Sequence, residues 1–273
     1  MRDSFDRRIR YLRVSVTDRC NLRCAYCSPP EARPEAVPLR PFREEELLSL
    51  DEIARIVRAA VGLGVDKVRL TGGEPLVRPG IVELVAELAR IDGLETLCMT
   101  TNGSLLAPLA AELKEAGLGS LNVSLDSIEP DRYELITGGG SLAAALAGIE
   151  AAIGASIPVK LNIVVPGAAG GEATDAEAVE RYGRERGASS QRILRYELAA
   201  RKVDDPRFDR PPPCGRCDRI RLLADGRLKP CLHSDIAIKV DMDDIGGSLL
   251  ACVGMKPERG GVCTTLAVGQ IGG

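Results

Sequence analysis

The sequence predicts an α/β fold in which about six strand–helix units build a parallel sheet. Short apolar runs, many of them β-branched, alternate with longer helix patterns through the middle of the chain. Such alternation implies parallel strands. The length of 273 residues suits one large domain or a domain with a small appendage, and an α/β barrel would use most of it.

The expected strands end near Gly, Asn, Asp or Pro, and several expected helices have an acidic first turn and a glycine at the end. We expect strands at residues 10–16, 66–72, 94–102, 120–126, 159–165 and 191–198. Helices are expected at residues 50–64, 81–91, 106–118, 141–155 and 172–187. Residues 28–46, rich in Pro and Glu, are expected to form a surface excursion. The glycines at 138–140 lack the Lys-Ser/Thr of a P-loop and indicate a turn.

The character of the chain changes after residue 198. Residues 199–213 are charged, end in three prolines and show no periodicity, which is typical of a linker. From Cys214 onward cysteines return, glycine becomes frequent and no long helix pattern is visible. We therefore expect a first domain at residues 1–198, a linker at 199–213 and a small C-terminal domain at 214–273.

Composition excludes several classes of protein. A net charge of −3 argues against a general nucleic-acid-binding surface. No apolar run approaches the roughly 20 residues that span a bilayer, and the N-terminus lacks a signal core, so we expect a cytoplasmic protein without a membrane anchor. One histidine argues against His-rich zinc catalysis and Ser-His-Asp hydrolysis. In a reducing compartment, clustered cysteines are expected to bind metal or do chemistry.

Three cysteines lie close together directly after the first expected strand. Cys20, Cys24 and Cys27 have the spacing C-x3-C-x2-C, and the next cysteine is Cys98. Structural zinc sites take four ligands, and a 4Fe–4S cluster is normally held by four cysteines. Held by three, the cluster keeps one iron open for an amine and a carboxylate, such as those of S-adenosylmethionine (SAM). The alternative is a cysteine-rich loop or a zinc site completed from elsewhere.

Two motifs together resemble the radical SAM superfamily. The first is the cysteine trio with Tyr26 before its last member, and the second is the "TGGEP" of residues 71–75 after the second expected strand. The resemblance implies a partial (β/α)6 TIM-type barrel, which agrees with the count of units. It also implies a SAM-bound 4Fe–4S cluster at the carboxyl ends of the strands, where both motifs fall.

A second set of three cysteines, Cys214, Cys217 and Cys231, has the spacing C-x2-C-x13-C. We interpret it as the ligand set of an auxiliary 4Fe–4S cluster with another open iron, which makes residues 214–273 a small C-terminal iron–sulfur auxiliary domain. Alternatively, Cys252 or Cys263 supplies a fourth ligand, giving a zinc site or an ordinary cluster.

Longer stretches are similar to the GTP 3′,8-cyclase family of molybdenum cofactor biosynthesis. The resemblance covers about residues 8–165 and 214–273, in "YLRVSVTDRCNLRCAYC", "TGGEPLVR", "MTTNG", "LNVSLDS", "VKLN", "CDRIRLLADGRLKPCL" and the terminal "QIGG". It implies a lyase that converts GTP to 3′,8-cyclo-7,8-dihydro-GTP through a 5′-deoxyadenosyl radical, in the first step of molybdopterin biosynthesis. It further implies a reducing electron donor, a downstream cyclic pyranopterin monophosphate synthase and a possible homodimer.

The same resemblance implies roles for individual residues. SAM would contact Tyr26, Gly73 and Ser124, with Asn102 and Asn162 as further candidates. Arginine suits phosphate because its planar fork binds two oxygens at once. The expected GTP contacts are Arg13, Arg69, Thr100, Lys160, Arg219 and Arg221, and Arg219, Arg221, Gly272 and Gly273 would assist catalysis. Cys98 is expected in the core, and His233 is expected to be structural or exposed.

The sequence departs from the family pattern in three places. The chain is shorter between the sixth strand and Cys214, Asp218 stands where the family usually has Asn, and "RILRYEL" leaves either Arg192 or Arg195 as the pocket arginine.

Two other functions stay open: a radical SAM peptide-modifying enzyme with one auxiliary cluster, and a non-enzymatic iron–sulfur or zinc protein.

Overall fold

One sheet of nine strands runs through the molecule in the order β6-β5-β4-β3-β2-β1-β7-β8-β9. The computed structural model describes residues 1–27, 42–165, 175–195, 198, 200–205, 207, 208, 212–266 and 268–271. The strands are β1 (Tyr11–Ser15), β2 (Lys67–Thr71), β3 (Thr96–Thr101), β4 (Ser120–Ser124), β5 (Val159–Val165), β6 (Ser189–Leu194), β7 (Arg219–Leu222), β8 (Arg227–Lys229) and β9 (Ile238–Lys239). Strands β1 to β6 are parallel to one another, which confirms the predicted α/β fold with a parallel sheet.

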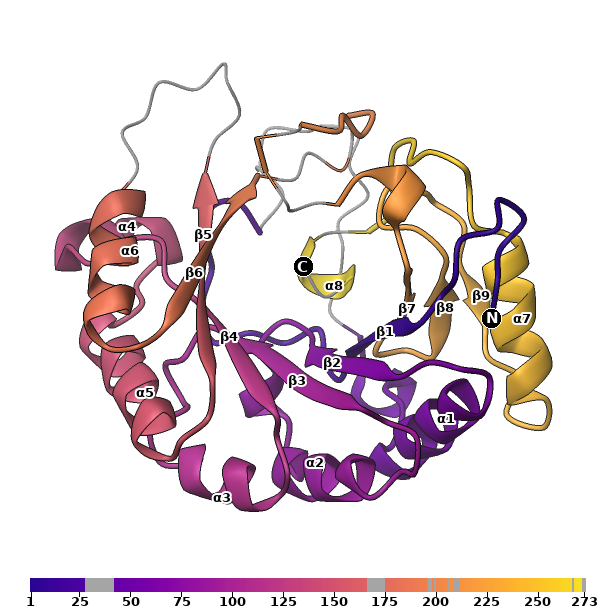
Figure 1. The fold of residues 1–273 in the computed structure, drawn as a ribbon, viewed down its shortest axis with the longest axis horizontal. Helices are drawn as coiled ribbons and strands as arrows, with labels where there is room; N and C mark the ends of the chain where they lie inside the picture. The colour runs from indigo at the N-terminus through magenta and orange to yellow at the C-terminus, as the bar shows by residue number, and fades with distance from the viewer. Residues whose placement is uncertain are drawn as a thin grey trace.

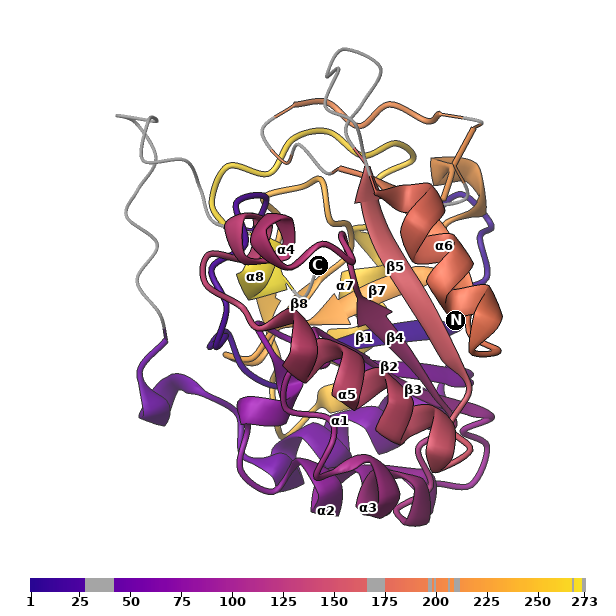
Figure 2. The same cartoon turned by 90° about the vertical axis from the view of Figure 1, so that its left-hand side faces the viewer.

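Most of the helices cover the outer side of this curved sheet (Figure 1). The helices of the described residues are α1 (Leu50–Gly62), α2 (Ile81–Ala89), α3 (Ala110–Glu115), α4 (Pro130–Thr137), α5 (Leu142–Gly154), α6 (Ala176–Glu185), α7 (Ile245–Gly254) and α8 (Val268–Ile271), with 3-10 turns η1 (Glu44–Glu46), η2 (Pro75–Val77) and η3 (Cys214–Arg216). Figure 2 shows α1, α2, α3 and α5 as one layer against the strands. The short α8 lies on the inner side of the curve (Figure 1).

Helix α1 shows why these segments fold as the pattern predicts. Ser49 accepts a hydrogen bond from the Glu52 N–H at 3.2 Å, and the Glu52 carboxylate accepts one from the Ser49 N–H at 2.8 Å. This reciprocal cap satisfies two donors that the first turn leaves open. Ile53, Ile56 and Val57 then recur at helical spacing and are fully buried in the core.

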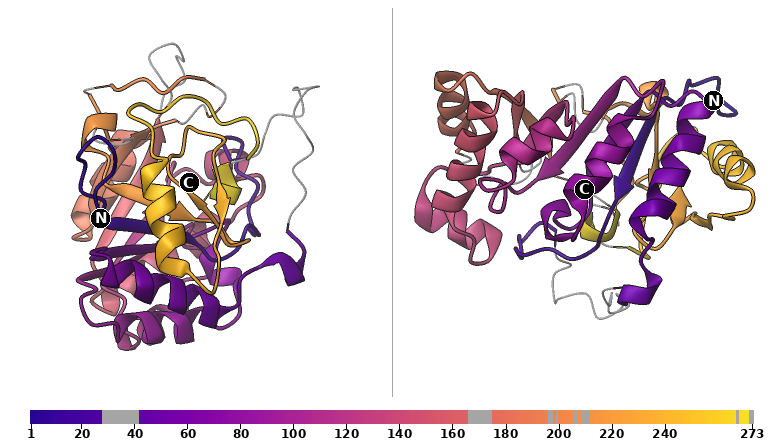
Figure 3. Two further views of the ribbon diagram at one scale, coloured as in Figure 1. Left: turned by 90° about the vertical axis from the view of Figure 1, so that its right-hand side faces the viewer. Right: turned by 90° about the horizontal axis from the view of Figure 1, so that it is seen from below.

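The C-terminal segment joins the same sheet as the strand–helix units. Strand β7 pairs in parallel with β1, and β8 and β9 continue antiparallel. The expected boundary at residues 199–213 therefore separates two segments that share one sheet. Helix α7 packs on α1, β8 and β9, so it extends the outer layer (Figure 3).

Three helices, α4, α7 and the four-residue α8, were not predicted. No long helix pattern is visible in the sequence after Cys214, and the structure has the ten-residue helix α7 there. Its "IGGSLLACVG" contains three glycines, and the helix is instead set by Asp244, which caps the Gly247 N–H at 2.8 Å, and by packing on α1. Helix α4 was also missed, although Pro130 in its first turn and left-handed Gly138 after its end are typical helix boundaries.

No single helix in the described part of the chain is long and apolar enough to cross a membrane. The consecutive helices α4 and α5 reach that length and apolarity only together, and they are bent by 96° relative to each other.

Candidate functional site: two cysteine loops and the arginines between them

The first cysteine loop leaves the carboxyl end of β1. Cys20 is exposed, Cys24 and Cys27 are half-buried, and all three are free thiols. The Cys27 N–H donates to the Cys24 carbonyl at 3.0 Å. Burial and the charges of its neighbours, Cys24 and Cys20 among them, raise the pKa of Cys27 to about 12. The three sulfurs are therefore close enough to interact electrostatically.

The loop after β2, residues 71–75, packs against this cysteine loop backbone to backbone. The Gly73 N–H donates to the Thr17 carbonyl at 2.8 Å, and the Glu74 N–H donates to the Arg19 carbonyl at 2.8 Å. A Cβ at Gly73 would lie 2.2 Å from the Arg19 carbonyl oxygen. Position 73 thus requires glycine because another backbone occupies the space of a side chain.

Glu74 joins the loops that follow β2 and β3. Its carboxylate accepts from the Thr101 hydroxyl at 2.7 Å, the Asn102 N–H at 2.7 Å and the Leu76 N–H at 3.0 Å. Burial raises the pKa of Glu74, and the hydrogen bond from the Asn102 N–H lowers it in part. Asn102 in turn directs its amide toward Cys20, with Nδ2 at 3.9 Å from Sγ. Asn102, a secondary candidate from the sequence, therefore touches the first cysteine loop.

Tyr26 ties the same loop to the ends of β4 and β5. Its hydroxyl donates to Asp126 Oδ2 at 2.6 Å, and Asp126 Oδ1 accepts from the Val164 N–H at 2.7 Å. Burial raises the pKa of both Tyr26 and Asp126. Ser124 lies two residues before Asp126, at the end of β4 and in register with Asn162.

The carboxyl end of α4 supports the cysteine loop from another side. The Arg23 N–H donates to the Thr137 carbonyl at 2.9 Å, and the Ala25 N–H donates to the Ile136 carbonyl at 3.0 Å. Gly138 has a φ of +67°, and a Cβ there would lie 2.8 Å from the Arg23 carbonyl oxygen. The glycines at 138–140, predicted as a turn, therefore end α4 and let the cysteine loop approach it.

Three arginines from neighbouring strands lie side by side in the sheet. Arg13 on β1 is in register with Arg69 on β2 and with Arg221 on β7. Residues in register on adjacent strands project from the same face of the sheet. All three are buried, with 8%, 7% and 4% of their surface exposed. The topology thus gathers cations from three segments that are far apart in the sequence.

Tyr11 lies among these cations. Its hydroxyl accepts from Arg69 Nε at 2.8 Å and from Arg13 Nη1 at 3.5 Å. The Arg219 guanidinium lies 5.1 Å from the centre of its ring. Burial raises the pKa of Tyr11, but the charges of Arg13 and Arg69 outweigh burial and the pKa falls to about 8. Sequence reasoning missed Tyr11, because an aromatic residue in a strand signals only core packing.

The other expected GTP contacts lie along the next strands. Thr100 on β3 is in register with Asn122, which is in register with Lys160 on β5. The Thr100 hydroxyl accepts from Arg69 Nη1 at 3.2 Å, and Lys160 is exposed. Asn162 accepts from the Asn122 amide at 3.0 Å and from the Gln191 amide at 2.7 Å, which places it in a cross-strand network.

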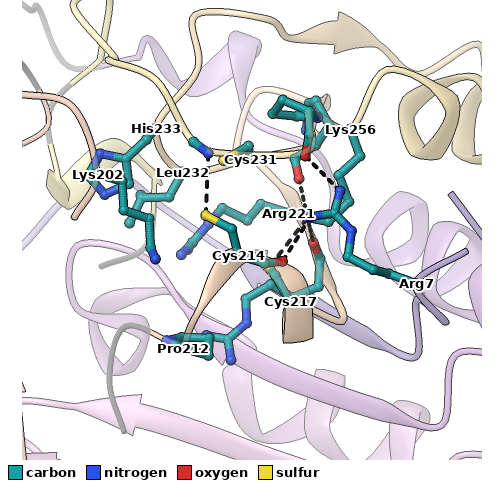
Figure 4. A pocket seen from close by; sticks show the side chains of 14 residues that line it. Arg7, Lys202, Pro212, Cys214, Cys217, Arg221, Cys231, Leu232, His233 and Lys256 are labelled. Atoms are coloured by element: carbon teal, nitrogen blue, oxygen red, sulfur yellow. Dashed lines mark hydrogen bonds between the residues drawn. The ribbon is translucent and has the colours of Figure 1, made fainter. Parts of the chain in front are cut away.

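The second cysteine set lines a single pocket (Figure 4). This pocket has a volume of about 530 Å³, including its open mouth. It is walled by Cys214, Cys217 and Cys231 together with Arg7, Lys202, Arg219, Arg221, His233 and Lys256. The pocket wall is therefore cationic around the three sulfurs and reaches Arg221 of the arginine row.

Arg7 fastens the Cys214 turn to the chain beyond α7. Its guanidinium donates to the carbonyls of Cys214 at 2.8 Å, Pro257 at 2.6 Å and Glu258 at 3.0 Å, and to Asp3 Oδ2 at 2.6 Å. The Arg7–Asp3 pair is almost fully buried. An N-terminal residue thus fixes the second cysteine loop, which no local sequence pattern indicates.

Strand direction sets the two cysteine loops on opposite sides of the arginine row, one beyond each end of the strands that carry it. Cys27 follows β1, whereas Cys217 precedes β7, and these strands are parallel neighbours. Arg13 and Arg221 lie within the two strands. A ligand that lies on the row would therefore have one cysteine loop on each side, along the direction of the strands.

The remaining candidates lie partly outside this arrangement. Cys252 is buried in the main core, and Cys263 is buried with Leu198, Leu223 and Leu266 in a smaller cluster; neither lines the pocket. Arg192 pairs with Glu180 of α6 at 2.8 Å.

Cys98 is buried as expected, and His233 is buried beside the second trio, where burial lowers its pKa to about 4. Gly272 and Gly273 lie outside the described residues, but the preceding Ile271 carbonyl accepts from Arg221 Nη1 at 3.2 Å.

Neither cysteine trio forms a tight ligand set for one metal ion in the part of the chain that the structure describes. Within the described residues no three His, Cys, Asp or Glu side chains converge tightly enough to hold one metal ion. Each trio is nevertheless within electrostatic reach of its own members. In an iron–sulfur cluster each thiolate binds a different iron, so the sulfurs stand further apart than around one ion.

The family is settled by comparison with known proteins. The family model described as "Radical SAM superfamily" matches residues 14–168. GTP 3′,8-cyclase of Alkaliphilus oremlandii (strain OhILAs) is 38% identical over 326 aligned positions, which cover 100% of this chain and 100% of that protein. The chain belongs to the GTP 3′,8-cyclase family of the radical SAM superfamily. Another member, GTP 3′,8-cyclase of Moorella thermoacetica (strain ATCC 39073 / JCM 9320), is 39% identical and covers 92% of this chain and 88% of its own.

Solved structures share the fold of this family member. SuiB of Streptococcus suis bound to the precursor peptide SuiA superposes with a TM-score of 0.66 at 14% identity, covering 89% of this chain and 66% of that one. The anSMEcpe structure with bound AdoMet has a TM-score of 0.61 at 15% identity, covering 91% and 81%. At these identities the likeness concerns the fold.

Proposed function

We propose that this chain is a GTP 3′,8-cyclase, which converts GTP to 3′,8-cyclo-7,8-dihydro-GTP in the first step of molybdenum cofactor biosynthesis. The observation that carries the proposal is the buried row of Arg13, Arg69 and Arg221 between two three-cysteine loops. GTP carries about four negative charges, and buried guanidinium groups bind phosphate oxygens in pairs. The row thus offers a triphosphate site in a chain whose net charge is −3.

The two loops supply the cofactor sites. Cys20, Cys24 and Cys27 would hold one 4Fe–4S cluster, with Gly73, Tyr26 and Ser124 around its SAM. Cys214, Cys217 and Cys231 would hold the other. When bound, the first cluster and SAM would supply the radical chemistry for the ribose, and the second cluster would supply an iron with an open position for the substrate. We assign the curved sheet to a partial (β/α)6 barrel and residues 214–273 to an auxiliary domain.

The chain's own residues bind and orient the nucleotide. Arg13, Arg69 and Arg221 would neutralise the triphosphate, and Thr100 and Lys160 would extend this site across β3 and β5. Arg219, with its Nε buried and without a hydrogen-bond partner in the described part of the chain, is ready to donate. Gly272 and Gly273, outside the described residues, would assist catalysis. An electron donor, a downstream cyclic pyranopterin monophosphate synthase, a homodimer and a cytoplasmic location stay predictions.

The test is anaerobic reconstitution with iron and sulfide, followed by SAM, dithionite and GTP. We expect about eight irons per chain, as two 4Fe–4S clusters require, GTP-dependent formation of 5′-deoxyadenosine, and consumption of GTP. About two irons or fewer, or zinc in their place, would contradict the proposal and favour a non-enzymatic metal protein. Cleavage of SAM that is independent of GTP would contradict it in favour of a peptide-modifying enzyme.

A further inference from the structure

Lys256 is a buried cation in direct contact with the second cysteine set. It follows α7, has 3% of its surface exposed, and lines the pocket shown in Figure 4. Its Nζ donates to Cys217 Sγ at 3.4 Å, to the Arg219 carbonyl at 2.7 Å and to the Pro230 carbonyl at 2.8 Å. An ammonium group has three N–H donors, so these three acceptors use all of them.

The three acceptors lie at or next to the cysteines of the second set and at an expected GTP contact. Cys217 is the middle cysteine of the set, Arg219 is an expected GTP contact that begins β7, and Pro230 immediately precedes Cys231. Of the three acceptors, only the cysteine sulfur can carry a negative charge. The fixed positive charge is therefore directed at one ligand sulfur while two backbone carbonyls hold it in place.

We propose that Lys256 is a positioning residue that tunes the second cluster, by donating a charge-assisted hydrogen bond to the Cys217 thiolate that raises the reduction potential of that cluster. Hydrogen bonds to ligand sulfurs and nearby charge are recognised determinants of iron–sulfur potentials. When the cluster accepts one electron its negative charge increases by one, and a cation at 3.4 Å from a ligand sulfur stabilises that reduced form. This inference rests on the proposed function in one respect, that the second trio binds a cluster.

Lys202 provides a matched comparison within the same pocket. It also lines the wall, but its Nζ pairs with Asp204, and its contacts with the cysteine loop are indirect. Asp204 neutralises that charge and accepts from the Cys214 N–H at 3.2 Å. If the contact between Nζ and the sulfur determines the reduction potential of the second cluster, removing Lys202 should change that potential much less than removing Lys256.

The experiment is an EPR-monitored redox titration of the full-length reconstituted protein, without GTP. The second cluster is the EPR component that SAM does not alter. We expect Lys256→Met to lower its midpoint potential so that the ratio of reduced to oxidised cluster at a given potential falls at least tenfold, which is ~59 mV for one electron. Lys256→Arg should restore most of the difference, Lys256→Gln should be intermediate, and Lys202→Met should shift it less than threefold.

Each outcome separates this inference from the proposed function. Wild-type protein with about four irons and no SAM-insensitive signal would refute the second cluster itself. Wild-type protein with both clusters, and a potential unchanged in Lys256→Met, would overturn the tuning role and leave Lys256 as a structural residue. If Lys256→Met fails to assemble the second cluster, Lys256→Gln decides: an unchanged potential overturns the inference, and a lowered one supports it. Equal shifts in Lys202→Met and Lys256→Met would also overturn it.

Discussion

At the scale of single residues, Tyr11 shows how the protein holds several cations together before any anion arrives. Its hydroxyl is a shared acceptor for Arg13 and Arg69, and its ring faces Lys67 at 5.2 Å and Arg219 at 5.1 Å. Like charges that are close and buried repel one another strongly. A phenol that can become a phenolate is thus placed where negative charge lowers this repulsion.

This placement predicts a pH dependence of stability. The pKa of Tyr11 in the folded chain is lowered to about 8 from its ordinary value of 10. A lowered pKa means that the folded state releases its proton first, so stability rises with pH between about 8 and about 10 and this gain is lost as pH falls through 8. We expect the difference in free energy of unfolding between wild type and Tyr11→Phe, in metal-free protein, to grow by about 2–3 kcal/mol across that window.

Urea unfolding at several pH values checks this expectation. Tyr182→Phe is the control, because burial raises the pKa of Tyr182 to about 12 and no gain is expected below pH 10. Adding GTP should reduce the effect, since the triphosphate then neutralises the arginines in place of the phenolate. A difference between wild type and Tyr11→Phe that stays constant with pH would disprove the account.

At the scale of elements, the first cysteine loop is held in place by hydrogen bonds to the neighbouring loop and to the end of a helix. The cysteine loop after β1 bonds to the loop after β2 through Gly73 and Glu74, and to the end of α4 through Arg23 and Ala25. Glu74 continues the chain of contacts to Thr101 and Asn102 after β3. The proposed site of the first cluster is therefore built from several strand ends, as expected for the carboxyl face of a parallel β/α sheet.

Gly73→Ala tests how closely these two loops approach. The added Cβ would lie 2.2 Å from the Arg19 carbonyl oxygen, so the loops must separate. We expect affinity for SAM to fall at least tenfold, because Gly73, an expected SAM contact, moves away from the first trio. The measurement is the SAM-induced change in the EPR spectrum of the first cluster. Gly154→Ala is the control: it lies at the end of α5, where nothing lies within 4 Å of the added Cβ, and its response to SAM should equal that of the wild type. A normal SAM response in Gly73→Ala would show that the close approach of the two loops at Gly73 is not needed for SAM binding.

At the scale of the whole molecule, the sheet brings together cations that lie more than 200 residues apart in the sequence. Arg13 and Arg221 are in register because β7 pairs with β1, on the side of β1 that is turned away from β2. Arg7 makes a second connection, from the N-terminus to the Cys214 turn and the chain after α7. The N-terminal segment thus links the two cysteine loops.

The arginine row gives a prediction for GTP. Replacing Arg13, Arg69 or Arg221 singly with Met removes a charged hydrogen-bond donor worth about 1.5–3 kcal/mol, so kcat/KM for GTP should fall about 10- to 100-fold, chiefly through KM. The rate of 5′-deoxyadenosine formation at increasing GTP concentration measures this. Arg58→Met is the control, since Arg58 on α1 is 57% exposed and pairs with Glu87 on the outer surface. If kcat/KM for GTP falls no more in these variants than in Arg58→Met, the three arginines do not bind GTP.

The sequence by itself determined what depends on neighbours along the chain. Six strands and most of the helices could be located because apolar spacing, caps and glycines act over a few residues. Both cysteine trios could also be recognised from the sequence, because their members are separated by few residues. The family motifs then supplied Arg13, Arg69 and Gly73 as expected site residues.

Only the tertiary structure decided which distant segments meet. It placed β7 beside β1, folded the glycine-rich α7 against α1, and brought Tyr11, Arg7 and Lys256 to the charged sites. None of these residues carries a local pattern that distinguishes it from core or surface residues of the same type. Their roles follow from charge, burial and hydrogen bonds between strands far apart in sequence, and those energies exist only once the sheet has formed.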